Sequence, residues 1–92
     1  MPYNGYEQEA ISNTAKDISD LSPVATATHV ELQAETNHIR YTMDGSTTPT
    51  TTTGMLLLTT DPPKVFLMED FRNIKFIRDA ASDAVLNVHY FN

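Results

Sequence analysis

Three histidines are the residues of this chain whose type comes closest to metal or acid–base chemistry. A zinc site needs three or four ligands that converge on one metal ion. His29, His38 and His89 show neither the H-x-H nor the H-x-x-x-H spacing of a short zinc motif. His29 and His38 could still face each other across a predicted hairpin, on its polar face. We interpret all three as solvated surface histidines.

The acidic residues and the glycines also lack the spacings that catalysis or ligand binding uses. Glu69-Asp70, Asp79 and Asp83 do not form the dense D-x-[DN]-x-[DN]-G pattern of a calcium loop. There is no G-x-S-x-G, no cysteine for a Cys/His pair, and only three glycines for a phosphate-binding loop. The sequence therefore predicts a protein that is not an enzyme and has no catalytic residue, metal site or cofactor.

Length and charge restrict the possible partners. A chain of 92 residues makes one domain and buries only roughly two-thirds of its unfolded surface. Such thin cores are often supplemented by disulfides, metals or oligomerisation. Because the chain has no cysteine, oligomerisation is the route that the sequence favours. The net charge is −6 and the six basic residues are scattered singly, which argues against nucleic-acid binding.

No segment of the sequence resembles a membrane or export signal. The longest apolar run, Met-Leu-Leu-Leu at residues 55–58, is far too short to span a bilayer. The first residues lack the basic segment and following apolar stretch of a signal peptide. We therefore expect no membrane partner, and assembly inside a cell.

Short apolar and alternating runs predict six strands, separated by turn signals. These strands cover residues 28–35, 38–43, 55–58, 64–68, 71–78 and 84–90. The first two are expected to pair as a hairpin, Glu69-Asp70 to form a turn, and residues 11–21 to be an irregular or edge strand. The pattern predicts an all-β fold, a single small immunoglobulin-like β-sandwich of six or seven short, mostly antiparallel strands. Residues 1–10 are expected to be an extended N-terminal arm, and residues 11–92 the sandwich domain.

The segment IRYTMDGSTTPT, at residues 39–50, reads as a strand that enters a tight turn and a Thr-rich loop. Gly45 is expected at positive φ, because the Asp44-Gly45 turn needs such a residue. The segment resembles the I-x-Y-T-x-D-G-S-x-P-T signature of immunoglobulin-like β-sandwich modules similar to chitobiase/β-hexosaminidase C-terminal-like domains. The chain has one more residue between Ser46 and Pro49 than this signature. The resemblance covers about residues 28–78 and implies a structural role for the motif.

A second resemblance covers more of the chain. The order of the segments ATHVEL, IRYTMDG, TGMLL, NIKFIR and AVLNVHYF is similar to that in small virion structural proteins of tailed bacteriophages. It implies a capsid decoration (cement) protein that binds the phage major capsid protein on the virion surface and is assembled in the host cytoplasm. A homo-oligomer, such as a trimer at a local symmetry axis, fits this role. A tail, neck or fibre component of such a particle is the nearest alternative.

A carbohydrate-associated immunoglobulin-like module is an alternative of another class. Sugar binding uses exposed aromatic platforms, and the chain has no Trp. Tyr41 and Tyr90 are expected to point inward, which leaves Tyr3 and Tyr6 as candidates.

Two predicted strands are apolar on both faces, at residues 55–58 and 65–68. Either the sandwich closes over both faces, or one face belongs to an interface, where aromatic and Met side chains are enriched. In the second strand the outward pair is either Phe66 and Met68 or Val65 and Leu67. The residues selected as interface candidates are Tyr3, Tyr6, Phe66, Met68, Val85 and Phe91.

Overall fold

A computed structural model describes residues 2–92 of the chain. Within these residues, seven strands form two antiparallel sheets, and two short helices lie in the connections between strands. This arrangement confirms the predicted all-β sandwich. The elements are β1 (Tyr3–Ile11), a 3-10 helix η1 (Ile18–Asp20), β2 (His29–Glu35), β3 (Ile39–Thr42), β4 (Met55–Leu57), β5 (Lys64–Leu67), α1 (Met68–Phe71), β6 (Lys75–Arg78) and β7 (Ala84–Phe91). The strand order is β1-β7-β2-β5 in the four-stranded sheet and β4-β3-β6 in the three-stranded sheet.

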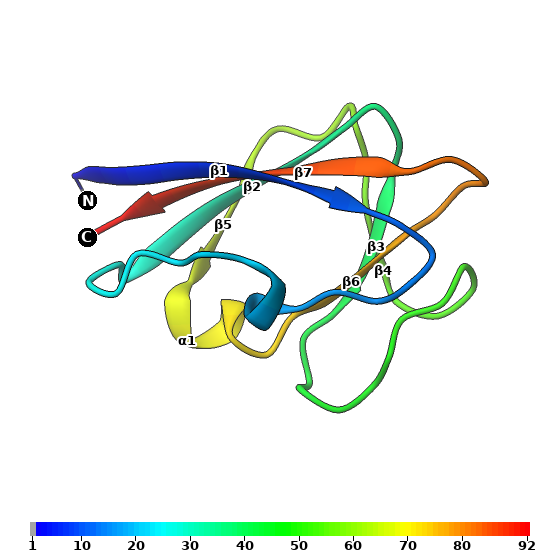
Figure 1. Cartoon of the computed structure of the whole chain (residues 1–92), viewed down its shortest axis with the longest axis horizontal. Coiled ribbons are helices and arrows are strands. Elements are labelled where there is room, and N and C mark those ends of the chain that lie inside the picture. The colour runs from blue at the N-terminus through cyan, green and yellow to red at the C-terminus, as the bar shows by residue number, and fades with distance from the viewer. Residues whose placement is uncertain (1) are drawn as a thin grey trace.

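The long strands β1, β2 and β7 run side by side, and both ends of the chain lie at the same end of the molecule (Figure 1). The last strand, β7, lies between the first two. Immunoglobulin constant domains instead place their last strand in the same sheet as the third and sixth strands. The resemblance to immunoglobulin-like modules therefore extends to the two-sheet architecture and not to this strand order.

The core is built from the alternate residues of the strands that face the other sheet. In β2 and β7 the buried residues are two positions apart, as the pleat requires. The fully buried side chains include Val30, Leu32, Ile39, Leu57, Phe71, Ile74, Phe76, Leu86, Val88 and Tyr90. Burying each of the larger ones contributes roughly 1.5–3 kcal/mol.

The expectation of an N-terminal arm outside the domain is wrong for the part of it that the structure describes. Residues 3–11 form β1, which pairs with β7 from Tyr3↔Phe91 to Ile11↔Ala84, and Ile11 is fully buried. The inward positions Glu7 and Glu9 are charged, so the alternation that marks a strand is hidden in the sequence. Both carboxylates find partners, since Glu7 accepts the Ser22 backbone N–H and Glu9 lies 3.4 Å from the Lys16 ammonium. Met1 lies outside the described residues.

The predicted hairpin between residues 28–35 and 38–43, which contain β2 and β3, is also wrong. β2 pairs with β5 and β7, whereas β3 pairs with β4 and β6 in the other sheet. The chain crosses between the sheets at Thr36, whose φ of 73° is left-handed. His29 and His38 therefore do not face each other, and His38 Nδ1 accepts the backbone N–H of Thr59 at 3.0 Å.

Two segments differ from the predicted strands and turns. Residues 68–71, expected to end one strand and to begin another after a turn, form the single-turn helix α1. Residues 11–21 contain η1, which is capped at its start: the Asp17 carboxylate accepts the backbone N–H of Ser19 at 2.9 Å, and the Asp20 carboxylate accepts the backbone N–H of Asp17 at 3.1 Å. Just before η1, Lys16 exchanges two backbone hydrogen bonds with Phe76, at 2.8 and 2.7 Å. This contact covers the free edge of β6.

The turn at Asp44-Gly45 forms as predicted, with Gly45 at a φ of 76°. The Asp44 carboxylate accepts the backbone N–H groups of Ser46 (3.0 Å) and Thr47 (2.8 Å), as well as the Thr47 hydroxyl. These bonds lower the pKa of Asp44 to about 2, the Thr47 hydroxyl having the largest effect. The Asp44 carboxylate therefore serves to stabilise the turn.

Candidate binding surface

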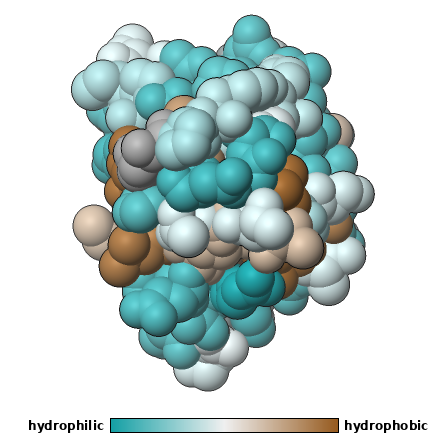
Figure 2. Space-filling model, turned by 90° about the vertical axis from the view of Figure 1, so that its left-hand side faces the viewer, coloured by the Kyte–Doolittle hydropathy of each residue, from teal (hydrophilic) through white to brown (hydrophobic). Residues whose placement is uncertain are grey.

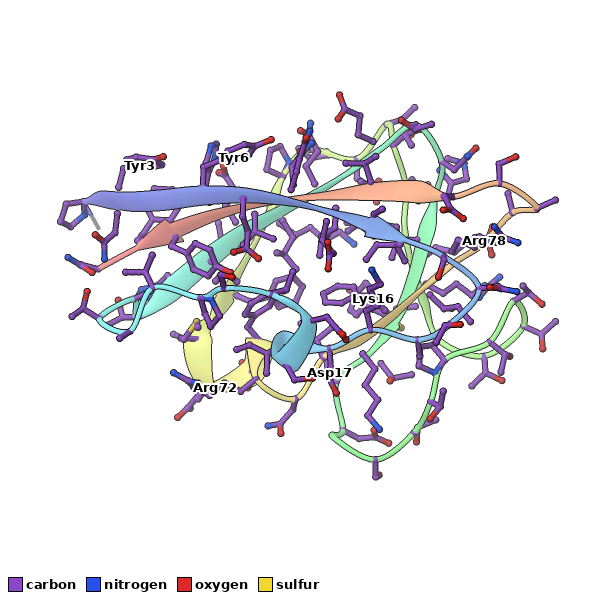
Figure 3. The ribbon with its side chains drawn as sticks, viewed as in Figure 1. Tyr3, Tyr6, Lys16, Asp17, Arg72 and Arg78 are labelled. Atoms are coloured by element: carbon purple, nitrogen blue, oxygen red, sulfur yellow. The ribbon has the colours of Figure 1, made fainter. Side chains whose placement is uncertain are left out.

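The four-stranded sheet has one face against the core and one face open to solvent. We call the second the outer face. The alternation of burial and the strand register place these residues on it: Tyr3, Tyr6, Gln8 and Ala10 of β1; Val85, Asn87, His89 and Phe91 of β7; His29, Glu31, Gln33 and Glu35 of β2; and Val65 and Leu67 of β5. Figure 3 shows Tyr3 and Tyr6 projecting from β1 to the same side, away from the body of the protein.

Aromatic rings gather on the outer face near the chain ends. The ring of His89 has Tyr6 at 5.1 Å, Tyr3 at 5.6 Å and Phe91 at 6.3 Å, measured between ring centroids. Tyr3 and Tyr6 nevertheless stay 62% and 49% exposed. Large aromatic side chains in this state are typical of surfaces that bind another molecule.

Aliphatic side chains extend this group across the sheet. Val65 and Leu67 of β5 are 52% and 46% exposed, and they lie opposite Glu31 and His29 of β2. Figure 2 shows the end of the molecule that carries the chain termini, where small hydrophobic areas are separated by hydrophilic residues. On the outer face itself, the burial pattern and the strand register place exposed apolar side chains beside polar ones, as in a non-obligate interface.

A chain of polar contacts fixes the middle of the outer face. The Tyr6 hydroxyl donates to Asn87 Oδ1 at 2.7 Å, which ties β1 to β7. The Asn87 amide in turn donates to Glu35 at 3.4 Å, and His89 Nδ1 lies 3.1 Å from Glu31 Oε1. These contacts hold the Tyr6 ring and the Glu31 carboxylate in place.

An open depression of about 190 Å³ lies among these groups. It is lined by Tyr6, Glu31, Gln33, Pro63, Asn87 and His89. An aromatic ring, a carboxylate and two side-chain amides therefore face one small volume. Such a combination can stack on a flat group and accept its hydrogen bonds.

The outer face carries the carboxylates Glu31 and Glu35 and neither Lys nor Arg. Four basic residues elsewhere in the described chain lie in ion pairs, which are Lys16–Glu9, Arg40–Asp79, Lys64–Asp61 and Arg78–Asp83. Together with the net charge of −6, this makes the outer face acidic. A positively charged partner would be attracted to it.

Four of the six interface candidates lie on the outer face: Tyr3, Tyr6, Val85 and Phe91. The other two do not. Met68 is 4% exposed and belongs to the core, because it begins α1 beneath the sheet. Phe66 lies opposite Val30, points inward and packs edge-on against Tyr41. The outward pair of β5 is therefore Val65 and Leu67, the alternative that the sequence left open.

The polar residues of the depression were missed by sequence reasoning. Glu31, Gln33 and Asn87 look like the ordinary solvated positions of amphipathic strands. The sequence indicates only that these three residues occupy outward-facing positions of their strands. The strand order β1-β7-β2 is needed to place them beside Tyr6 of β1. Tyr41 and Tyr90 do point inward as predicted, with exposed fractions of 5% and 1%.

Other exposed apolar side chains occur at the three-stranded sheet: Met55 and Leu56, which alternate along the edge strand β4, and Met43, which directly follows β3. Within residues 2–92, no cluster of three or more His, Asp or Glu side chains could hold a metal ion. Across the same residues, none of the helices has the length and apolar character needed to cross a membrane.

An antiparallel β-sandwich with an open, acidic and aromatic sheet face defines the class to which this chain belongs structurally. Beyond that class, no protein-family model matches the chain, and no curated protein or solved structure is significantly similar to it.

Proposed function

We propose that the chain is a non-enzymatic structural protein of a bacteriophage particle, a capsid decoration (cement) protein that binds and stabilises the lattice of the major capsid protein. It acts on the virion surface after assembly in the host cytoplasm. It binds as a homo-oligomer, a trimer at a local symmetry axis of the lattice. The resemblance of its segment order to small virion proteins supports this role.

The observation that carries the proposal is the outer face, where Tyr3, Tyr6, Val65 and Leu67 are each about half exposed or more. A protein with a thin core gains nothing for its own fold by leaving four large apolar side chains in water. On contact with a capsid subunit, these side chains would be buried. Many identical copies, each adding a small interface, would together resist the pressure inside the particle.

Copy number separates decoration from the nearest alternative. Quantitative mass spectrometry of purified particles is expected to find this chain in hundreds of copies. A dozen copies or fewer would identify a neck, tail or fibre component and overturn the capsid assignment.

A matched pair of leucines tests the binding surface. Leu67 lies on the outer face and Leu56 on the opposite sheet, and both are partly exposed, at 46% and 39%. Leu67→Ser is expected to weaken binding to undecorated particles, whereas Leu56→Ser leaves it unchanged. The opposite result would move the interface to the three-stranded sheet.

A sugar-binding module is the second candidate, and the depression beside Tyr6 favours it. Amide and carboxylate groups next to an aromatic ring can also hold a sugar ring. Titration of the chain with neutral oligosaccharides, followed by NMR, tests this function. Saturable shifts at Gln33 and Asn87 would support it.

A further inference from the structure

We infer that the depression on the outer face receives the guanidinium group of an arginine side chain from the partner protein. This inference rests on the proposed function, because it names the chemistry by which the partner is held at the same face.

The shape and lining of the depression suit a flat cation. Tyr6 supplies an aromatic ring whose hydroxyl is fixed to Asn87 at 2.7 Å. Glu31 supplies a carboxylate, and Gln33 adds an amide carbonyl in the same space. A guanidinium group is planar, stacks on aromatic rings and carries five N–H donors that match carboxylate oxygens. A lysine ammonium is a compact point charge that would leave the aromatic wall largely unused.

Glu31 has a hydrogen-bonding atom available for this role. Its Oε1 contacts His89 at 3.1 Å, and within residues 2–92 the structure gives Oε2 no hydrogen bond. The side chain is 32% exposed, so the carboxylate is partly shielded from solvent. A charge-assisted hydrogen bond at such a site is stronger than one in open water.

The charges around the depression favour a cation over an anion. Glu31 and Glu35 lie on the outer face without a Lys or Arg beside them. Lys64, at the margin, comes next to Pro63 in the chain, and its ammonium lies 3.8 Å from Asp61. An anionic side chain of the partner would be repelled by these two carboxylates, and His89, at 3.1 Å from Glu31, would offset that repulsion only when it is protonated. Arginine is also one of the residue types enriched among interface hot spots, together with Trp and Tyr.

The first test uses the free side chain as probe. NMR spectra of the full chain are recorded during titration with N-acetyl-L-arginine amide and, separately, with N-acetyl-L-lysine amide. The arginine compound is expected to shift the resonances of Tyr6, Gln33 and Asn87 saturably and to bind at least about threefold more tightly than the lysine compound. Equal shifts with both compounds, or no shifts, would overturn the inference.

The second test compares two Glu→Gln substitutions, each of which removes one negative charge at a different position. Glu31→Gln keeps the shape of the depression, and Glu69→Gln removes a carboxylate from an exposed position of α1. Glu31→Gln is expected to weaken binding to undecorated particles at least about tenfold and to reduce its salt dependence, with Glu69→Gln close to wild type. Unfolding curves of both variants show whether they fold normally.

The results for Leu67→Ser and Glu31→Gln distinguish a wrong arginine site from a wrong binding face. If Leu67→Ser loses particle binding while Glu31→Gln stays within about threefold of wild type, the outer face is the interface and the arginine site is wrong. If neither substitution affects particle binding, the proposed function of the face fails as well. Saturable binding of a neutral oligosaccharide in place of the arginine amide would replace the inference with the sugar-binding alternative.

Discussion

The buried hydroxyl of Tyr90 and the carboxylate of Glu7 lie on the same inner side of the four-stranded sheet, where the carboxylate acts on the hydroxyl by its charge. Burial has the largest effect in raising the pKa of Tyr90, and Glu7 raises it further. Within residues 2–92 the hydroxyl makes no hydrogen bond at normal geometry, although the Glu7 carboxylate, which accepts the Ser22 backbone N–H, lies close enough to raise the pKa of Tyr90. The ring is therefore needed for packing, and its hydroxyl is not.

Removing the hydroxyl alone should have little effect on stability. Tyr90→Phe is expected to change the free energy of unfolding by less than about 1 kcal/mol, because an unpaired buried hydroxyl contributes nothing to the fold. Tyr90→Ala, which removes the ring from the core, is expected to cost about 3–5 kcal/mol. Urea unfolding measures both. A loss above about 2 kcal/mol for Tyr90→Phe would show that the hydroxyl has a partner.

The turn at residue 45 should not tolerate a β-branched side chain. Gly45 has a φ of 76°, and a Cβ there would meet Asn73 Oδ1 at 3.0 Å. Gly45→Val is expected to lower the free energy of unfolding by about 1–3 kcal/mol. The control is Ser46→Val at the exposed neighbouring position, which is outside the left-handed region. Equal stability of the two variants would contradict the turn geometry.

Acid should weaken the same turn over a defined pH range. The pKa of Asp44 falls from 3.8 to about 2 on folding, so its contribution is fully present above pH 3.8 and is lost as the pH falls through 2. Wild-type stability is therefore expected to decline more steeply than that of Asp44→Ala between these two pH values. Thermal unfolding at a series of pH values gives both slopes. Parallel curves would mean that the Asp44 carboxylate does not stabilise the turn.

Deleting residues 1–10 should destabilise the isolated domain. β1 and β7 pair at eight positions, and seven of these are lost with the deletion. At a net contribution of about 0.5–1 kcal/mol for each ladder hydrogen bond, the loss is expected to exceed about 3 kcal/mol. Tyr3→Ser, which keeps the strand, serves as the control for lost side-chain contacts. An unchanged unfolding midpoint after the deletion would show that β1 is dispensable for the fold.

The strands that could be predicted are those in which buried apolar residues alternate with more exposed residues. In β2 and β7 every second residue is apolar, so these strands can be recognised without knowing their partners. β1 breaks the rule because Glu7 and Glu9 point inward and are satisfied by Ser22 and Lys16, contacts that form only in the folded chain. The helix α1 gives little signal, since it has four residues and its N-cap, Leu67, makes no side-chain hydrogen bond.

The candidate site could be predicted only in its aromatic part. Tyr3 and Tyr6 stand out because large rings are unusual in a polar segment. The assignment of Phe66 and Met68 failed because a strand that is apolar on both faces does not reveal which face is inward. That choice depends on the register of β5 against β2, where Phe66 lies opposite the buried Val30.

The two ends of the chain leave the protein from adjacent antiparallel strands, β1 and β7, at the same end of the sheet (Figure 1). A pulling force between the ends would break the hydrogen bonds of this strand pair one after another. The force would not act on all of these bonds at the same time. Opening would begin at Tyr3 and Phe91, where the register shift before Gly5 already interrupts the pairing. The domain is therefore expected to open at a lower force when it is pulled by its two ends than when it is pulled across the sheet.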